Sequence, residues 1–219
     1  MKKNAILFLI LFLSLVIYSK VNAQTNDVEN EFNTWISTDL KYKFSKKIQL
    51  TVTPELRLEN DFEWNKFLLE SKLRYKVFKY LDVSGGYRFT IENSNSNDVS
   101  YFQRFFIDLG TSKKFNRFEA KFGIKYTNEA EFNTDNQYNY LRYKGGIEYN
   151  IPHHKITPFF SLEAFHSLDN KMVDKFRYHI GAAYKINKHN QIELGYKLDY
   201  YMTKYKNSHI LGLSYRFKF

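Results

Sequence analysis

The chain has 219 residues, a formal net charge of +10, no cysteine and an aromatic fraction of 19%. The lack of cysteine excludes a fold held by disulfides, and only three prolines and nine glycines suit long strands better than disorder. A basic balance is also typical of nucleic-acid binding, but the lysines and arginines are dispersed along the chain. We therefore expect no nucleic-acid partner.

The first residues have the order of a secretory signal peptide. Lys2 and Lys3 precede an apolar run at 5–18, and Val21-Asn22-Ala23 supplies the small residues of a cleavage site. The apolar run is shorter than the ~20 residues that a membrane-spanning helix needs. The sequence predicts a cleaved signal peptide over residues 1–23 and one mature domain over residues 24–219.

The clearest structural signal is the alternation of apolar and polar side chains. In residues 48–59 every even position is apolar and every odd position is polar or charged. A strand points successive side chains to opposite faces, so this pattern predicts a strand between an apolar and a wet environment. Pro54 and Pro158 have no N–H to donate and are expected near bulges or strand starts. In chain order the predicted strands are 34–44, 48–59, 66–77, 81–92, 100–112, 117–127, 138–149, 156–166, 174–186, 191–202 and 208–219.

These segments are long enough to cross a bilayer at a tilt. Lipid cannot hydrogen-bond a backbone, so such strands must close into a cylinder. The sequence predicts an all-β fold, an antiparallel transmembrane up-and-down β-barrel of 10–12 strands in the bacterial outer membrane. Eleven segments is an odd number, whereas single-chain bacterial barrels use even counts. Either residues 24–33 supply a further strand, which gives twelve, or one of the segments is not in the wall, which gives ten, and twelve is favoured. A soluble periplasmic β-barrel or sandwich binding protein, with its apolar face inward, is the alternative.

The connections between predicted strands alternate in character. One set is short and basic, as at 45–47 and 113–116. The other set is mostly longer and rich in Asn and acidic residues, as at 93–99 and 128–137. Outer-membrane barrels have short periplasmic turns and longer outer loops, so the basic set is expected on the periplasmic side.

Several stretches, weak singly, occur in a telling order: Thr34–Ser37, Pro54–Leu58, Gln103–Phe106, Leu141–Tyr143, Pro158–Phe165, Phe176–Tyr178, Gly195–Tyr196 and His209–Leu213. In these stretches the chain resembles the outer-membrane β-barrels catalogued as Domain of Unknown Function 2490. The resemblance covers nearly all of the mature chain. It implies a barrel in the outer membrane of a Gram-negative bacterium, and it carries no known catalytic residues. The terminal Phe219 resembles the signal by which such proteins engage the outer-membrane assembly machinery.

The polar strand faces hold both charge signs, with more Lys and Arg than Asp and Glu. One hypothesis is a narrow pore that favours anions. The other, rated slightly higher, is a closed interior filled by ion pairs. The expected partners are outer-membrane lipid, the assembly machinery during biogenesis, and small-molecule or ion solutes. The residues expected to line the lumen are Glu55, Arg57, Arg74, Arg104, Arg142, Glu163, Arg177 and Lys197.

No local pattern of a barrel enzyme is found. A lipase or deacylase would place His and Ser two residues apart on one strand face, whereas His166 and Ser167 are adjacent. His153 and His154 lie in a predicted turn without nearby carboxylates, so no metal site is expected there. The sequence also has no phosphate loop or nucleophile elbow. We expect no enzymatic activity and no cofactor, with an outer-membrane hydrolase as the alternative.

The face assignment can be tested with two substitutions on one predicted strand. Leu194→Arg places a charge on the lipid side and is expected to cost ~2–4 kcal/mol if the site lies near the middle of the membrane. Lys197→Arg keeps a charge on the lumen side and is expected to cost little. Unfolding of the detergent-refolded variants measures both changes, and equal tolerance of the two would contradict the assignment.

Overall fold

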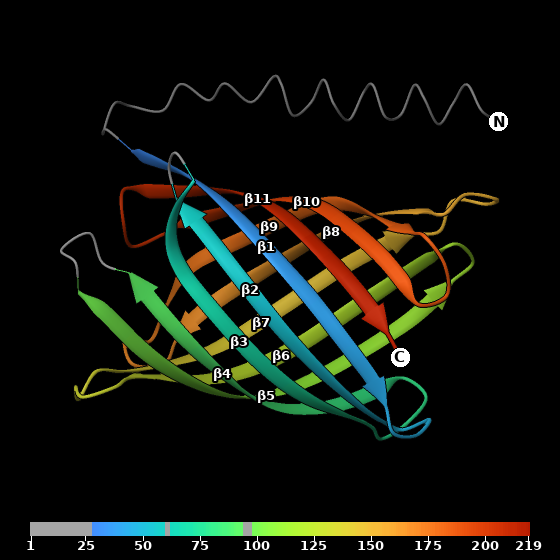
Figure 1. The fold of residues 1–219 in the computed structure, drawn as a ribbon, viewed down its shortest axis with the longest axis horizontal. Helices are drawn as coiled ribbons and strands as arrows, with labels where there is room; N and C mark the ends of the chain where they lie inside the picture. The colour runs from blue at the N-terminus through green and yellow to red at the C-terminus, as the bar shows by residue number, and fades with distance from the viewer. Residues whose placement is uncertain (1–27, 60–61, 94–97) are drawn as a thin grey trace.

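The computed structural model describes residues 28–59, 62–93 and 98–219, and within them the fold is all β (Figure 1). The predicted signal peptide and residues 24–27 lie outside the described residues. In the described part, no helix is long and apolar enough to cross a membrane. The strands in these ranges are β1 (Glu29–Lys43), β2 (Ile48–Glu59), β3 (Glu63–Lys76), β4 (Leu81–Asn93), β5 (Val99–Phe115), β6 (Phe118–Glu131), β7 (Gln137–Tyr149), β8 (Ile156–Ser167), β9 (Met172–Lys185), β10 (Asn190–Tyr201) and β11 (Lys206–Lys218).

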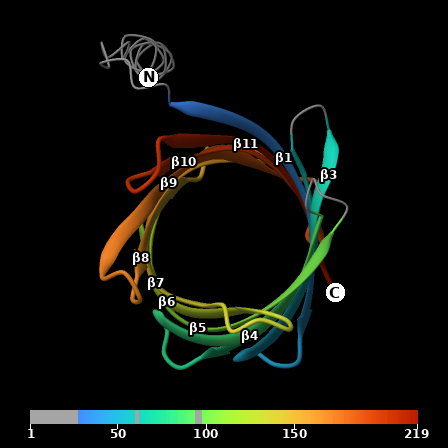
Figure 2. The ribbon, with the colours of Figure 1, turned by 90° about the vertical axis from the view of Figure 1, so that its left-hand side faces the viewer.

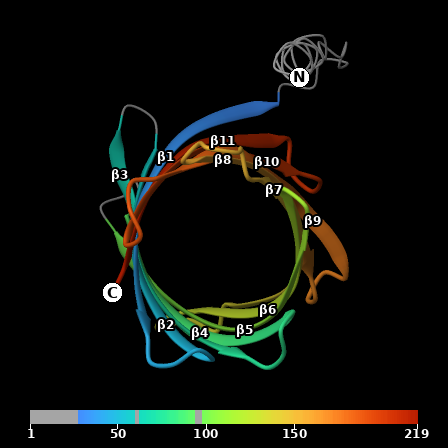
Figure 3. The same ribbon diagram turned by 90° about the vertical axis from the view of Figure 1, so that its right-hand side faces the viewer.

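The eleven strands in these ranges close into a barrel. Each strand pairs antiparallel with the next, and β1 and β11 pair parallel to complete the ring (Figures 2 and 3). The register of this seam runs from Glu29 opposite Lys206 to Lys41 opposite Lys218. With an odd number of up-and-down strands, the first and last strands run in the same direction, so the closing pair must be parallel.

Two sequence-based expectations are therefore wrong. The prediction of an even strand count, with twelve favoured, fails because residues 29–33 extend β1 instead of forming a separate strand. The prediction of a purely antiparallel barrel fails at the seam between β1 and β11. The remaining strands lie close to their predicted positions, as β2 at Ile48–Glu59 illustrates.

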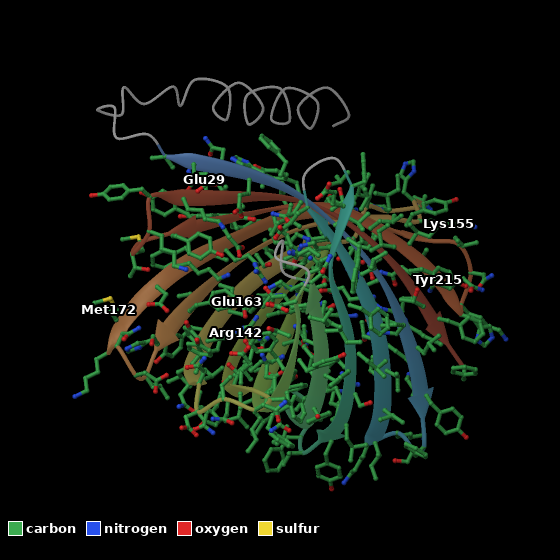
Figure 4. The ribbon with its side chains drawn as sticks, turned by 60° about the vertical axis from the view of Figure 1, so that its left-hand side comes forward. Glu29, Arg142, Lys155, Glu163, Met172 and Tyr215 are labelled. Atoms are coloured by element: carbon green, nitrogen blue, oxygen red, sulfur yellow. The ribbon has the colours of Figure 1, made fainter. Side chains whose placement is uncertain are left out.

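The two ends of the barrel differ in charge more than in loop length. At one end of the barrel, which we call the turn end, the connections are 44–47, 77–80, 116–117, 150–155 and 186–189. At the loop end they are 60–62, 94–98, 132–136, 168–171 and 202–205. Figure 4 shows Glu29 and Met172 at the loop end, and Lys155 and Tyr215 at the turn end.

The expected contrast between short turns and longer loops is wrong. The strands run further toward the loop end than the sequence pattern indicated, and β6 continues to Glu131. The connections at the two ends are consequently similar in length. The chemical contrast remains, because Lys46, Lys47 and Lys79 lie in turns while Asp98 and Asp135 lie in loops.

The apolar face of the wall points outward. Large hydrophobic side chains such as Leu194, Ile107 and Leu213 are exposed on the outside of the barrel. Several polar and charged side chains, among them Glu163 and Asp199, are instead buried. This arrangement is opposite to that of a soluble barrel, which turns its apolar face inward.

The prolines have different positions in their strands. Pro158 is the third residue of β8, close to its start as expected. Pro54 lies in the middle of β2, contrary to the expectation that it would sit near a bulge or strand start. The β1–β2 ladder lapses there, because two residue pairs are missing between the Ser37–Glu55 pair and the Leu40–Val52 pair, while the register on either side is the same. This lapse accommodates the missing N–H without ending the strand.

The parallel seam can be tested with cysteine pairs, because the chain has no native cysteine. Ser37 and Ser214 are register partners on the inner face, so Ser37→Cys with Ser214→Cys is expected to cross-link by oxidation or by a short thiol reagent. Ser37→Cys with Glu193→Cys is the matched control, since β11 separates these residues by about 10 Å. A cross-link in the control alone would contradict the parallel closure.

Candidate functional site

The candidate site is the inner face of the barrel, where charged side chains of nearly every strand converge. All eight residues predicted to line the lumen lie on inward-facing positions, but they do not form one cluster. All five arginines among them have a carboxylate partner across or along the wall, with Arg57 bound to Glu55 at 2.6 Å and Arg142 bound to Glu163 at 2.8 Å. Arg177 pairs with Asp199 at 2.5 Å, Arg104 pairs with Glu129, and Arg74 lies 3.6 Å from Asp82.

Trp35 forms the centre of one cluster. Its ring centroid lies 3.7 Å from Cζ of Arg57, 4.9 Å from Cζ of Arg177 and 4.5 Å from Nζ of Lys197. β1 and β9 are separated in the wall by β10 and β11, so Arg177 reaches Trp35 through the interior. We call Trp35, Arg57, Arg177 and Lys197 the Trp35 cluster. It spans part of the barrel cross-section, and Trp35 is only 8% exposed.

A second aromatic ring, that of Phe165, also lies close to Arg177 and to two further cations. The Phe165 centroid lies 4.4 Å from Arg142, 4.7 Å from Lys175 and 5.1 Å from Arg177. An aromatic face attracts a cation through its quadrupole, and the attraction is stronger where water is excluded. The two rings therefore stabilise a concentration of positive charge that carboxylates alone do not neutralise.

Asp199 is the most deeply buried acid of the inner face, with 2% exposure. It accepts two hydrogen bonds from Arg177, at 2.5 Å to Oδ1 and 2.6 Å to Oδ2. Nζ of Lys175 donates a third at 2.7 Å. Such a bidentate, charge-assisted arrangement fixes the guanidinium plane, which in turn orients Arg177 toward Trp35 and Phe165.

Arg142 and Glu163 form a diagonal pair. The residue opposite Arg142 on β8 is Phe165. The residues opposite Glu163 are Lys144 on β7 and Arg177 on β9. Glu163 nevertheless binds Arg142, by a hydrogen bond of 2.9 Å from Nε (Figure 4). Lys144 is left without a carboxylate oxygen within 4.0 Å in the described ranges.

A cavity of about 590 Å³ occupies the inner face toward the turn end. Asp82, Glu119 and Glu148 line its outer part, each one residue from the turn-end terminus of its strand. The Arg142–Glu163 pair lies at its deeper end. We call this space the lumen cavity.

The sequence analysis missed the inward-facing aromatic side chains. Trp35, Phe106 and Phe165 all occupy the polar face of their strands and are at most 8% exposed. The signal was present, because Trp35 falls between the inward positions Asn33 and Ser37. Sequence reasoning overlooked these positions because an aromatic side chain on a barrel strand is usually expected on the outer face or at the membrane interface.

The histidines do not assemble a recognisable reaction centre. His153 lies in the β7–β8 turn with a positive φ of 61°. His179 lies on the inner face against Phe159, with ring centroids 4.8 Å apart. It is the register partner of Ser161, yet no hydrogen bond joins the two side chains in the described structure. Among the described residues, no group of three or more His, Cys, Asp or Glu is placed to hold a metal.

Phe219 ends the chain at the seam. Its N–H donates to the carbonyl of Lys41 at 3.0 Å, and its ring packs at 4.8 Å from Phe217 and 6.2 Å from Tyr42. The predicted assembly signal thus belongs to an outward aromatic group at the turn end, and its role in assembly stays a prediction.

Comparison with known proteins gives a family without an assigned activity. The family described as "Protein of unknown function (DUF2490)" matches residues 32–209. This match covers β2 to β10 and most of β1. No curated protein matches the chain.

The Asp199 contacts predict that an ion pair of the interior contributes much more to the free energy of unfolding than an ion pair of the surface. Asp199→Ala leaves two buried cations without their partner and is expected to destabilise the barrel by about 3–5 kcal/mol. Lys114→Ala removes a pair with Glu119 at 3.8 Å in which the lysine side chain is 72% exposed, and should cost less than about 1 kcal/mol. Urea unfolding of the detergent-refolded variants measures both, and equal costs would refute the structural role of Asp199.

Proposed function

Because the chain belongs to the DUF2490 family, whose description assigns no activity, we propose its function from the barrel itself. We propose a bacterial outer-membrane β-barrel whose nearly closed lumen lets only small solutes pass and favours anions. The observation that carries this proposal is the combination of a continuous apolar outer face with a charged inner face. Outer-membrane lipid as a partner follows from the same arrangement, and the assembly machinery and small-molecule or ion solutes stay predicted partners.

The outer face has the chemical layers that a bilayer requires. Aliphatic side chains such as Leu69, Ile107 and Leu194 are exposed near the middle of their strands. Aromatic side chains are exposed near strand ends, as Tyr75 is at the turn end and Tyr101 at the loop end. Membrane barrels carry an apolar band between two aromatic girdles, because aromatic rings with polar tips suit the headgroup level.

The inner face supports a narrow passage instead of a wide channel. The Trp35 cluster joins β1, β2, β9 and β10 across the interior, and further ion pairs lie on other strands of the inner face. Lys72, Lys125, Lys144 and Lys197 face the interior without a carboxylate oxygen within 4.0 Å in the described ranges. A passage lined by such uncompensated positive charge favours anions over cations.

The alternatives fit the observations less well. A soluble periplasmic binding protein would have to keep its exposed aliphatic face in water, where large apolar patches are uncommon. An outer-membrane hydrolase needs a nucleophile in contact with a base, and His179 does not hydrogen-bond Ser161 in the described structure. A lipid-release assay with the reconstituted protein addresses this alternative directly, and the expected result is no release.

The placement in the membrane can be tested with the two tryptophans, because one faces inward and the other outward. Trp64 is 41% exposed and pairs with the outward Leu58, whereas Trp35 is 8% exposed in the interior. In liposomes, lipid brominated close to the headgroup is expected to quench Trp64 in a Trp35→Phe variant. The same lipid should leave Trp35 unquenched in a Trp64→Phe variant. Equal quenching of both residues, or of neither, would contradict the membrane placement.

Substitutions of the same two tryptophans also test whether the lumen forms a narrow passage. Trp35→Ala removes the ring that holds three cations in the cross-section, so single-channel conductance in planar bilayers is expected to rise several-fold. Trp64→Ala is the matched control and should leave conductance unchanged. The reversal potential in a salt gradient is expected to show anion preference. A conductance that does not respond to Trp35→Ala, or a preference for cations, would refute the proposed passage.

A further inference from the structure

The lumen cavity contains more positive charge than its carboxylates neutralise. Lys72, Lys125 and Lys144 line it without an ion-pair partner among the described residues. Asp108 is the one lining carboxylate of the described ranges that has no such partner. The other lining carboxylates are engaged by nearby cations, in the pairs Arg74–Asp82, Lys114–Glu119, Lys121–Glu148, Arg142–Glu163 and Arg216–Glu193.

The packing explains why these lysines remain without carboxylate partners. Nζ of Lys125 lies 4.2 Å from the Phe106 centroid, over the face of the ring. Lys144 is next to Glu163 in the register, but Arg142 binds that carboxylate. Lys72 faces Gly86 on β4, which has no side chain to offer. None of these three lysines has a carboxylate partner within 4.0 Å in the described ranges, so their charges are available to a solute.

A further lining residue leaves hydrogen-bonding capacity unused. Nε of Arg74 is buried and has no hydrogen-bond partner in the described part of the chain. Oδ1 of its neighbour Asp82 is in the same condition. Buried polar atoms without partners are uncommon in folded proteins, and they indicate a place where water or a ligand completes the contacts.

The cavity also has room for a solute. Gly110, Gly123 and Gly146 are inward-facing lining residues, so three positions of the wall contribute no side chain. A Cβ built at Gly110 would meet no atom within 4 Å. A volume of about 590 Å³ lies within the range of about 300–1,000 Å³ common for small-molecule sites.

We propose that the lumen cavity is a binding site for a small soluble solute that carries a phosphate group, held by Lys72, Lys125 and Lys144. Lysine binds phosphate as a compact point charge, and several lysines around one space favour an anion of more than one charge. The barrel wall separates these side chains from the surrounding lipid, so the ligand is a free solute and not a lipid headgroup. The inference rests on the proposed function only for the route by which the solute reaches the cavity.

Calorimetric titration of the detergent-solubilised protein with inorganic pyrophosphate tests this site. The unsubstituted protein is expected to bind, and higher salt should weaken binding by screening. The double variant Lys125→Gln with Lys144→Gln is expected to raise the Kd at least tenfold. Gly110→Leu fills the cavity without changing charge and is expected to reduce binding as well. Gel migration with and without boiling shows that each variant retains its closed barrel.

The matched control is Lys79→Gln with Lys113→Gln. Both lysines are exposed, both lie over an aromatic ring as Lys125 does, and neither lines the cavity. This control removes the same charge and should leave the Kd within twofold. Absence of binding by the unsubstituted protein, or an equal loss in the control, would overturn the site.

The result of the pyrophosphate titration can be distinguished from the results that test the proposed function. If pyrophosphate does not bind while the tryptophan quenching and conductance results are as expected, the site is wrong and the membrane passage stands. If pyrophosphate binds through Lys125 and Lys144 while the protein does not conduct, the site stands and the lumen is a closed receptor instead of a passage.

Discussion

Hydrogen bonding between β1 and β11 is the contact on which the rest of the barrel depends. An open sheet would leave the N–H and C=O groups of two edge strands unpaired, at a cost of several kcal/mol for each group that is removed from water. The seam pairs these edges along most of β1, from Glu29 to Lys41. It also brings Trp35 of β1 within reach of Arg177 on β9 and Lys197 on β10 across the interior, so the Trp35 cluster exists only because the ring is closed.

Closure creates an interior that is polar yet tightly filled. Charged groups removed from bulk water are costly unless each one finds an opposite charge or a hydrogen bond. Asp199, Glu163 and Glu55 meet this requirement through arginine, while the Trp35 ring holds Lys197, which has no carboxylate partner in the described ranges. The interior therefore combines an electrostatically satisfied layer with a neighbouring space where positive charge is in excess.

Much of this architecture can be predicted from the sequence because strand alternation is a local property. The even and odd positions of 48–59 identify both the strand and its two faces, and β2 has those bounds. The closing pair cannot be read in this way, because residues 29–41 and 206–218 carry no local mark of whether they meet in parallel. Evenness of the strand count was a generalisation about other barrels, and it failed here.

The charged residues of the interior were predictable as a set, but their partners were not. Alternation places Arg142 and Glu163 on the inner face, yet their diagonal pairing depends on the register between β7 and β8. The lack of carboxylate partners for the cavity lysines also depends on such pairing. Arg142, for example, binds the carboxylate of Glu163, which lies opposite Lys144 in the register. Trp35 was missed because its aromatic character outweighed its position in the pattern.

The odd number of strands gives the polypeptide a polarity that an even-stranded barrel lacks. The beginning of β1 and the end of β11 lie at opposite rims, since the two strands run side by side in the same direction. In the membrane placement proposed above, with the basic turns on the periplasmic side, the C-terminal aromatic group lies at the periplasmic rim and the beginning of β1 lies at the outer rim. In that placement β2 to β11 form five hairpins that cross the bilayer and return, whereas β1 crosses once, so the start of β1 has to be carried to the outer rim during insertion.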